Sequence, residues 1–490
     1  MTNIRERIDS MNRKKSIACL LTITALLTTL TGCDSGFVPG GSAAKKPVEV
    51  TVWTYYNGEQ LESFTRLVDT FNQTIGKENN IVVTCSSSGN VDDLESDVLA
   101  AAEGKVGADP MPNMFSAYSD NAYTLDQKGL LENLESYFTD EEKAQYVDGY
   151  LEEGDLCGDG SLKIVPTAKS TELLFLNETD WEPFAAATGA SYEDMGTIEG
   201  LVKTAEKYYE WTDSQTPELN DGKALFGRDA MANYILVGAR QLGDTIFDAH
   251  DGVLTLHFEK DTVRKLWDNY YVPFIKGYFA ASGRFRSDDI KTGNIIAYVG
   301  STSSATFFPK EVASEDGSTH EIALKVLPNP RFQDGERFMV QQGAGIAVTH
   351  AEPEKVEACV AFLKWLTQPE QNLEFCADSG YLPVTKAANT MDAVEKSGIQ
   401  ISESGKEVLT TAFEQLSQSE MYTNHAFTDG KSARAVIEYA MSDCASADRA
   451  TVEERMAQGQ NFEEAAAEFL TDAYFDTWYE NTRAELEKFQ

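Results

Sequence analysis

Residues 48–85 read VEVTVWTYYNGEQLESFTRLVDTFNQTIGKENNIVVTC and hold two strand patterns with a helical pattern between them. Residues 48–53 and 81–85 are rich in β-branched side chains, which predicts a strand for each. Between them, apolar side chains recur at helical spacing over residues 59–72. The order strand, helix, strand is typical of a parallel pair with a crossover helix.

The same alternation continues along the chain. A helix is predicted over residues 91–103, and further strands are predicted over residues 113–118, 162–167, 171–177, 294–299, 323–328 and 345–348. Beyond about residue 400 the pattern is almost entirely helical. These patterns predict an α/β fold with a largely parallel sheet flanked by helices. In such sheets, ligands bind beyond the carboxyl ends of the strands.

The N-terminus has the pattern of a secretory signal. Five basic side chains precede the uncharged run Ser16–Leu30, which ends in Leu-Thr-Gly-Cys at Cys33. Fifteen helical residues span about 22 Å, short of the roughly 30 Å of a bilayer core. Residues 1–32 are therefore predicted to be a signal peptide, and the Cys resembles a bacterial lipobox in which Cys33 is lipidated. An ordinary signal peptide with an incidental Cys is the alternative.

Residues 33–47 are rich in Gly, Ser and Pro and are predicted to be a flexible tether. No later run of eighteen apolar residues suggests a membrane span. The protein is therefore expected outside the cytoplasm, held by its lipid on the outer face of the bacterial cytoplasmic membrane.

Composition disfavours several classes of partner and chemistry. The formal net charge of −38 repels nucleic acid and anionic lipid headgroups. The Cys and His residues are scattered, without the spacing of a metal site or a disulfide framework, although a single disulfide is left open. No nucleotide, dinucleotide or nucleophile-elbow motif is present. We therefore expect no metal, no cofactor and no enzymatic activity.

A family resemblance rests on motifs that occur in a fixed order. The chain has a lipobox, Trp at the end of the first strand, STELLFLN at residues 170–177, GNIIAYVGS at residues 293–301, KWLT at residues 364–367 and SGYLPV at residues 379–384. Each motif is weak, but together they resemble the family-1 extracellular solute-binding proteins of ABC importers, which include maltose-binding and glycerol-3-phosphate-binding proteins. The resemblance covers nearly the whole chain after the signal peptide.

The resemblance implies a two-lobed fold of the type II periplasmic-binding-protein kind, with a solute bound between the lobes. By this analogy lobe I holds residues 48–166 plus 327–382, and lobe II holds residues 169–325 plus 384–490. The chain would cross between them near Pro166, Leu327 and Pro383, and the crossings would form the hinge that closes on the solute.

Side chains at the ends of the first three strands are the first candidates for solute contact. Trp53 and Tyr55 follow the first strand, Ser87 the second, and Tyr118 the third. Aromatic rings pack on the apolar face of a sugar, and hydroxyl groups bind its polar edge. Alternatively, Trp53 belongs to the core and Ser87 caps the following helix.

Three further candidates lie later in the chain. Ser301 ends the strand of residues 294–299, and Glu172 lies beside the predicted hinge, where a carboxylate accepts hydrogen bonds from sugar hydroxyls. Tyr381 falls at a predicted crossing, and the resemblance implies that it lies near the solute.

Arg284 and Arg286 form an unusual basic cluster around an aromatic residue. Two guanidinium groups suit a phosphate, a carboxylate or sugar hydroxyls. The alternative is that they form structural ion pairs with Asp288 and Asp289.

These features predict a monomeric receptor that captures a carbohydrate and delivers it to the transmembrane subunits of an ABC permease. One alternative keeps this role for glycerol 3-phosphate or another small anion, bound by the two arginines. A second alternative, a surface enzyme or adhesin without transport, has no supporting motif.

Overall fold

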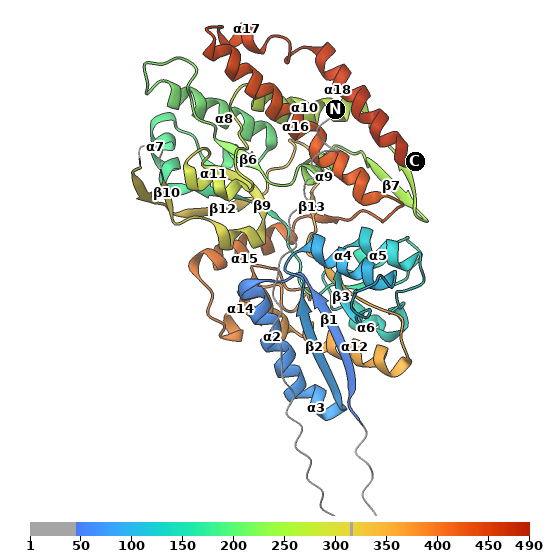
Figure 1. Cartoon of the computed structure of the whole chain (residues 1–490). Coiled ribbons are helices and arrows are strands. Elements are labelled where there is room, and N and C mark those ends of the chain that lie inside the picture. Colours follow the sequence, from blue (N-terminus) through green and yellow to red (C-terminus); the bar gives the residue numbers. More distant parts are fainter. Residues whose placement is uncertain (1–45, 314–316) are drawn as a thin grey trace, which may run out of the picture. The chain divides into compact units, whose positions relative to one another are not determined.

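Two β-sheets organise residues 46–313 and 317–490, which are the residues that the computed structural model describes (Figure 1). The predicted signal peptide, Cys33 and nearly all of the tether lie outside these ranges. Residues Lys46–Gln490 form one compact unit. Within the described ranges, no helix is both long and apolar enough to cross a membrane.

The first sheet has the strand order β2-β1-β3-β14-β4. Its strands are β1 (Val48–Thr54), β2 (Ile81–Ser87), β3 (Met114–Ala117), β4 (Ile164–Val165) and β14 (Gly345–Val348). β1 is parallel to β2 and β3, as the sequence predicts, whereas β14 is antiparallel to β3 and β4. The chain reaches β14 from the second sheet, which is described below, and not through a crossover helix. This explains why β14 runs in the opposite direction.

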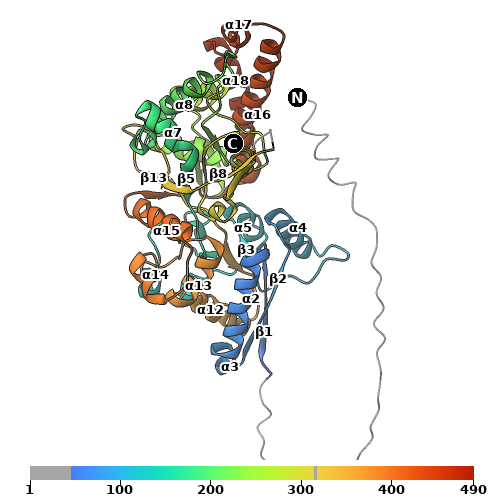
Figure 2. The same cartoon turned by 90° about the vertical axis from the view of Figure 1, so that its left-hand side faces the viewer.

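We call this sheet, with the elements that share its core, the first lobe. Its helices pack in two groups. α2 and α12 contact the strands, α13 packs on α2, and α4 contacts α5 (Figure 2). These helices are α2 (Gly58–Gln73), α3 (Ile75–Asn79), α4 (Val91–Ala102), α5 (Ser119–Asp126), α6 (Asp140–Lys143), α12 (Pro353–Leu366) and α13 (Pro369–Ser379), with short turns η1 (Glu135–Tyr137) and η2 (Glu152–Gly154). The apolar spacing of α2 buries Phe64, Leu67 and Phe71 in this core.

The second sheet has the order β12-β5-β9-β6. Its strands are β5 (Glu172–Asn177), β6 (Phe226–Arg228), β9 (Ala297–Ser301) and β12 (Leu324–Pro328). β5 is antiparallel to both β12 and β9, and only β6 and β9 run parallel. The prediction of a largely parallel sheet is therefore wrong for this lobe, because its neighbouring strands come from distant parts of the chain. The α/β fold class itself is confirmed.

β5 is buried along its whole length and separates two cores. Leu174 and Leu176 face one core, and Leu173 and Phe175 face the other. The first core is built by α7 (Glu178–Thr188), η3 (Tyr192–Met195), α8 (Ile198–Asp213), α9 (Met231–Gln241) and α10 (Lys260–Ile275), with the hairpin β7 (Phe247–His250) and β8 (Val253–Leu256). The second core is covered by α11 (Arg286–Thr292), η4 (Thr302–Phe307), α14 (Met391–Ser397) and α15 (Glu403–Leu416), near the hairpin β10 (Glu311–Ala313) and β11 (Thr319–Glu321).

The C-terminal tail is helical, as predicted, and adds to the first of these two cores. α16 (Gly430–Ala457) packs on α9 and α10, and α17 (Phe462–Ala466), α18 (Asp472–Leu486) and η5 (Glu487–Phe489) follow it (Figure 1). Trp267 and Trp478 pack at 4.6 Å between ring centroids and join α10 to α18. We call the second sheet with all these elements the second lobe.

Three connecting segments join the two lobes: residues 166–171, 329–344 and 380–390. They pair with one another through backbone hydrogen bonds. Ser170 and Gln342 each donate to the other's carbonyl at 2.8 Å, and Lys169 and Leu382 exchange a second pair of bonds. β13 (Phe338–Val340) lies in the second segment and pairs with β15 (Glu420–Tyr422), which precedes α16. The three connecting segments are thus hydrogen-bonded to one another between the two sheets.

Candidate functional site

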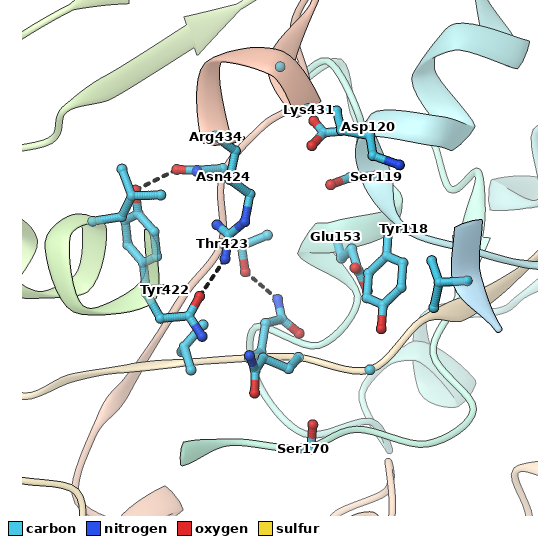
Figure 3. A pocket seen from close by; sticks show the side chains of 18 of the residues that line it. Tyr118, Ser119, Asp120, Glu153, Ser170, Tyr422, Thr423, Asn424, Lys431 and Arg434 are labelled. Atoms are coloured by element: carbon cyan, nitrogen blue, oxygen red, sulfur yellow. Dashed lines mark hydrogen bonds between the residues drawn. The ribbon is translucent and has the colours of Figure 1, made fainter. Parts of the chain in front are cut away.

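A cavity of about 540 Å³ lies where the two lobes meet the connecting segments (Figure 3). The first lobe supplies side chains from α4, from the start of α5 and from η2. The second lobe supplies side chains from α9, from the end of β9 and from the first turns of α16. The connecting segments supply Ser170, Gln341, Gln342 and Tyr381. The wall therefore joins parts of the chain that are far apart in sequence.

Aromatic rings form one side of the cavity. Tyr118 directly follows β3, and its ring stacks on Tyr55 at 6.4 Å between centroids. The hydroxyl groups of Tyr55 and Tyr381 lie 3.2 Å apart. Burial raises the pKa of all three tyrosines, so they stay neutral and keep their hydroxyl protons near neutral pH. This side therefore offers apolar ring surface together with neutral hydroxyl groups.

Two carboxyl groups of the first lobe line the cavity. Asp120 has no hydrogen-bond or ion-pair partner for its carboxylate among the described residues, and a Cβ placed on Gly430 would lie 2.7 Å from its Oδ1. Burial raises the pKa of Asp120, and Arg434 opposes this shift. Glu153, in η2, forms an ion pair with the buried Lys169. Both carboxylates can accept hydrogen bonds from a solute.

Two basic residues of α16 face these carboxylates, and both have partners. Lys431 lies 2.5 Å from Glu95 and 3.4 Å from Asp92. The guanidinium of Arg434 donates to Asn233 Oδ1 at 2.5 Å. Counting the charged lining residues, four are acidic and two are basic. The cavity therefore does not carry the excess of positive charge that would attract an anion.

The connecting segments place neutral polar groups on the floor of the cavity. The side-chain oxygens of Gln341 and Gln342 are buried and have no hydrogen-bond partner in the described part of the chain. The hydroxyl group of Ser170 is also without a partner in residues 46–313 and 317–490, although Ser170 is only 3 % exposed. Buried acceptors without a partner cost free energy, so a bound solute that donates hydrogen bonds would satisfy them.

The predicted contacts Tyr118, Ser301 and Tyr381 lie on the cavity wall. Tyr55 lies directly behind two of them, since its ring stacks on that of Tyr118 and its hydroxyl group contacts that of Tyr381. Ser301 is placed by the carboxyl end of β9, as the rule for α/β sheets predicts.

The remaining predicted residues do not line this cavity. Trp53 packs against the first-lobe core. Ser87 donates a hydrogen bond to the carbonyl of Tyr56 at 2.5 Å. Glu172 is 2 % exposed and accepts from Asn233 at 2.7 Å, with Arg228 at 3.5 Å. Glu172 thus reaches the cavity only through Asn233, which itself holds Arg434.

The two arginines of the basic cluster have separate environments. Arg286 is buried, pairs with Asp289, and lies 3.8 Å from Asp229. Arg284 is exposed and its guanidinium lies 5.2 Å from the Phe285 ring centroid. Neither lines the cavity, and the ion pair with Asp289 is the one that the sequence offered as an alternative.

Sequence reasoning did not select Asp120, Glu153, Arg434 or Tyr422 as site residues. Asp120 had a usable signal, since it follows Tyr118 at the end of a predicted strand. Arg434 and Tyr422 had none, because Arg434 reaches the cavity through the packing of α16 on α9, and Tyr422 through the pairing of β15 with β13.

A second hollow, of about 830 Å³, is larger, and second-lobe residues alone line it, among them Tyr208, Trp211 and Arg449. Its arginine is already held by the carbonyl of Ile275 at 2.9 Å and by Glu453. We regard the smaller cavity as the functional site, because it unites both lobes with the connecting segments. In the described ranges, no group of His, Cys, Asp and Glu side chains could hold a metal ion.

Comparisons with known proteins agree with this architecture. Residues 66–399 match the family of bacterial extracellular solute-binding proteins. The chain therefore belongs to this family, which confirms the resemblance and places the protein outside the cytoplasm. A search of curated protein sequences found no match.

Solved structures share the fold at low sequence identity. One is the cyclic α-maltosyl-1,6-maltose binding protein of Arthrobacter globiformis, with a TM-score of 0.65, 18 % identity, and coverage of 90 % of this chain and 100 % of that one. UgpB from Mycobacterium tuberculosis, in complex with glycerophosphocholine, has a TM-score of 0.63, 18 % identity, and coverage of 91 % and 98 %. The GacH receptor of Streptomyces glaucescens, solved with acarbose, has a TM-score of 0.62, 14 % identity, and coverage of 91 % and 100 %. All three confirm the two-lobed α/β fold.

Proposed function

We propose that the protein captures an uncharged carbohydrate in this cavity and delivers it to an ABC permease. The observation that carries the proposal is a set of acceptors that have no hydrogen-bond partner among the described residues: the Asp120 carboxylate and the amide oxygens of Gln341 and Gln342. A sugar has many hydroxyl donors to fill such acceptors, and its apolar face suits the rings of Tyr118 and Tyr381.

The comparisons support a carbohydrate without defining it. The Arthrobacter protein is named for an oligosaccharide that it binds, and the Streptomyces receptor was solved with acarbose. UgpB was solved with glycerophosphocholine, which also carries hydroxyl groups. Capture without a chemical step is part of the proposal, because the cavity groups are suited to hydrogen bonding.

A small anion such as glycerol 3-phosphate finds less support. The arginines predicted to hold it, Arg284 and Arg286, lie away from the cavity, and the two cations that line it already have partners. Acidic lining residues outnumber basic ones, and this adds a repulsive field.

Membrane attachment completes the proposed role. Lipidation of Cys33 would hold the protein on the outer face of the cytoplasmic membrane, where a monomeric receptor can reach the permease. The Gly-, Ser- and Pro-rich composition of residues 33–47 supports this part of the proposal, because such a composition is typical of a linker.

A thermal-shift screen of residues 34–490 tests the solute class. The panel holds glucose, maltose, maltotriose, mannotriose and glycerol 3-phosphate, each at about 1 mM. A sugar with a micromolar Kd would stabilise the protein by about 4 kcal/mol at this concentration, which raises the Tm measurably. We expect a rise with at least one sugar. A rise with glycerol 3-phosphate alone would favour the anionic alternative.

A further inference from the structure

Lys169 is a charged side chain with no exposed surface, and it lies in the first connecting segment. Its ammonium group contacts the carboxylate of Glu153 and donates to the carbonyl of Gly343 at 2.8 Å. Its backbone exchanges hydrogen bonds with Leu382. One residue thus joins η2 of the first lobe with all three connecting segments.

The ion pair determines where the Glu153 carboxylate lies. A buried ammonium is strongly unfavourable unless a carboxylate and further acceptors satisfy it. Among the described residues, Glu153 supplies the carboxylate that pairs with Lys169. The charge of Lys169 therefore holds one oxygen of Glu153, Oε2, in a fixed place at the back of the cavity.

The second oxygen of Glu153 is available to a solute. Glu153 Oε1 has no hydrogen-bond partner within residues 46–313 and 317–490, and the side chain lines the cavity beside Tyr118 (Figure 3). The negative charge of Glu153 also contributes to the raised pKa of Tyr118, which agrees with this proximity. A carboxylate held by one oxygen leaves the other with a defined direction for accepting a hydrogen bond.

We propose that Lys169 is a positioning residue that holds Glu153 so that its Oε1 accepts a hydrogen bond from a hydroxyl group of the bound solute. Glu153 thereby selects an uncharged, hydroxyl-rich solute and disfavours an anion, since a fixed carboxylate repels negative charge at this position. This inference rests on the proposed function, and it names the acceptor and the residue that orients it. No solute contact is assigned to Lys169 itself.

A double-mutant cycle tests the inference. The variants are Lys169→Met, Glu153→Gln and the combination of both, and the readout is the Kd, by calorimetry, of the panel sugar that binds the wild-type protein most tightly. Each single change should weaken binding by at least about tenfold, as expected for the loss of a hydrogen bond to a charged group. The combination should bind no more weakly than Glu153→Gln alone, because Lys169 acts through Glu153.

A matched control and a second solute separate positioning from a general structural role. Lys163→Met removes another ion pair of the first lobe, to Asp126 at 2.8 Å, outside the cavity, and should leave the Kd unchanged. Glu153→Gln should also shift the preference toward glycerol 3-phosphate, so that the ratio of its Kd to that of the sugar falls at least about tenfold. A purely structural defect would weaken both solutes alike.

The outcomes are distinguishable. If no panel sugar binds the wild-type protein, the proposed function fails and the inference fails with it. If a sugar binds but Lys169→Met weakens it equally in the wild-type and Glu153→Gln backgrounds, only the inference is overturned. If Lys169→Met does not fold, the test rests on Glu153→Gln alone. An unchanged Kd for the sugar, with an unchanged ratio of the two Kd values, would contradict the inference. The predicted changes in the sugar Kd and in that ratio would support it.

Discussion

At the scale of single residues, the cavity combines polar side chains whose acceptor atoms have no hydrogen-bond partner among the described residues. The carboxylate of Asp120 lies at the cavity wall and has no partner in the described residues. The amide oxygens of Gln341 and Gln342 also lack a hydrogen-bond partner there. Such groups reduce stability, and functional sites commonly retain them because they serve binding. The solute-binding proposal therefore predicts an opposition between stability and affinity at these positions.

Asp120→Asn should show this opposition. Burial raises the pKa of Asp120, so the folded state favours the protonated form. Its contribution to stability is present below the ordinary pKa of an Asp and is lost as the pH rises through the raised value. At pH 7 the variant should therefore be more stable, by about 0.5–2 kcal/mol, and this gain should shrink near pH 4.

Sugar affinity of the same variant should fall, by roughly tenfold or more, because a charged acceptor is lost. Urea denaturation at both pH values and calorimetric titration provide the measurements. Asp69→Asn, at an exposed position of α2, is the control and should change neither quantity. A variant that is less stable at pH 7, or that binds as tightly as the wild type, would contradict this role of Asp120.

The sequence predicts the residues that sit at strand ends and misses those that tertiary packing delivers. Tyr118 and Ser301 follow β3 and β9, so a local pattern and the rule for α/β sheets suffice to place them near the cavity. Glu153 lies in a short turn without a sequence signature, and its ion-pair partner is a lysine sixteen positions later. Arg286 shows the opposite case, since its acidic neighbour Asp289 binds it locally.

At the scale of the elements, the connecting segments join the two lobes and supply part of the cavity wall. Their mutual backbone pairing fixes Ser170 against Gln342 and Lys169 against Leu382. The strands of the first sheet, and β5, β9 and β12 of the second, could be predicted from their patterns, whereas β6 and the antiparallel order of the second sheet could not. Strand direction there depends on which distant segments become neighbours, and local periodicity holds no information about that.

Gly343→Ala tests how closely these segments must pack. Gly343 has a φ of +89°, and an added Cβ would lie 2.7 Å from the carbonyl oxygen of Ala168. We expect a loss of stability of about 1–3 kcal/mol from backbone strain together with this contact. Sugar affinity should fall as well, since Gly343 accepts the hydrogen bond of Lys169.

Gly398→Ala is the matched control for this change. Gly398 has a φ of +72°, but an added Cβ would meet no atom within 4 Å, so it carries the strain without the contact. Urea denaturation should show a smaller loss for this control and calorimetry an unchanged Kd. An equal loss of stability in both variants would mean that close packing of Gly343 against Ala168 is not needed.

At the scale of the whole molecule, the fold and the family agree with the predicted receptor, and the proposed lipid anchor concerns where it works. The strongly acidic composition keeps the protein soluble and away from anionic surfaces, so attachment to a membrane requires a separate device. In our proposal this attachment is a lipid on Cys33, because the segment around Cys33 resembles a lipobox.

Cys33→Ala should release the protein from the membrane fraction of cells that express the full-length chain. The change removes the sulfur that would carry the lipid and leaves the cavity untouched. Membrane fractionation with immunoblotting is the measurement, and Cys157→Ala is the control that should stay membrane-bound. Retention of the Cys33 variant in the membrane fraction would exclude the lipid anchor.

The central claim, capture of an uncharged sugar in the cavity between the lobes, is tested most directly by calorimetric titration of the wild-type protein. The best sugar of the thermal-shift screen and glycerol 3-phosphate are titrated in the same buffer at the same ionic strength. The account predicts one saturable site with a Kd in the micromolar range or below for the sugar, and a much higher Kd for glycerol 3-phosphate. Saturable binding of glycerol 3-phosphate with no binding of the sugar would contradict it.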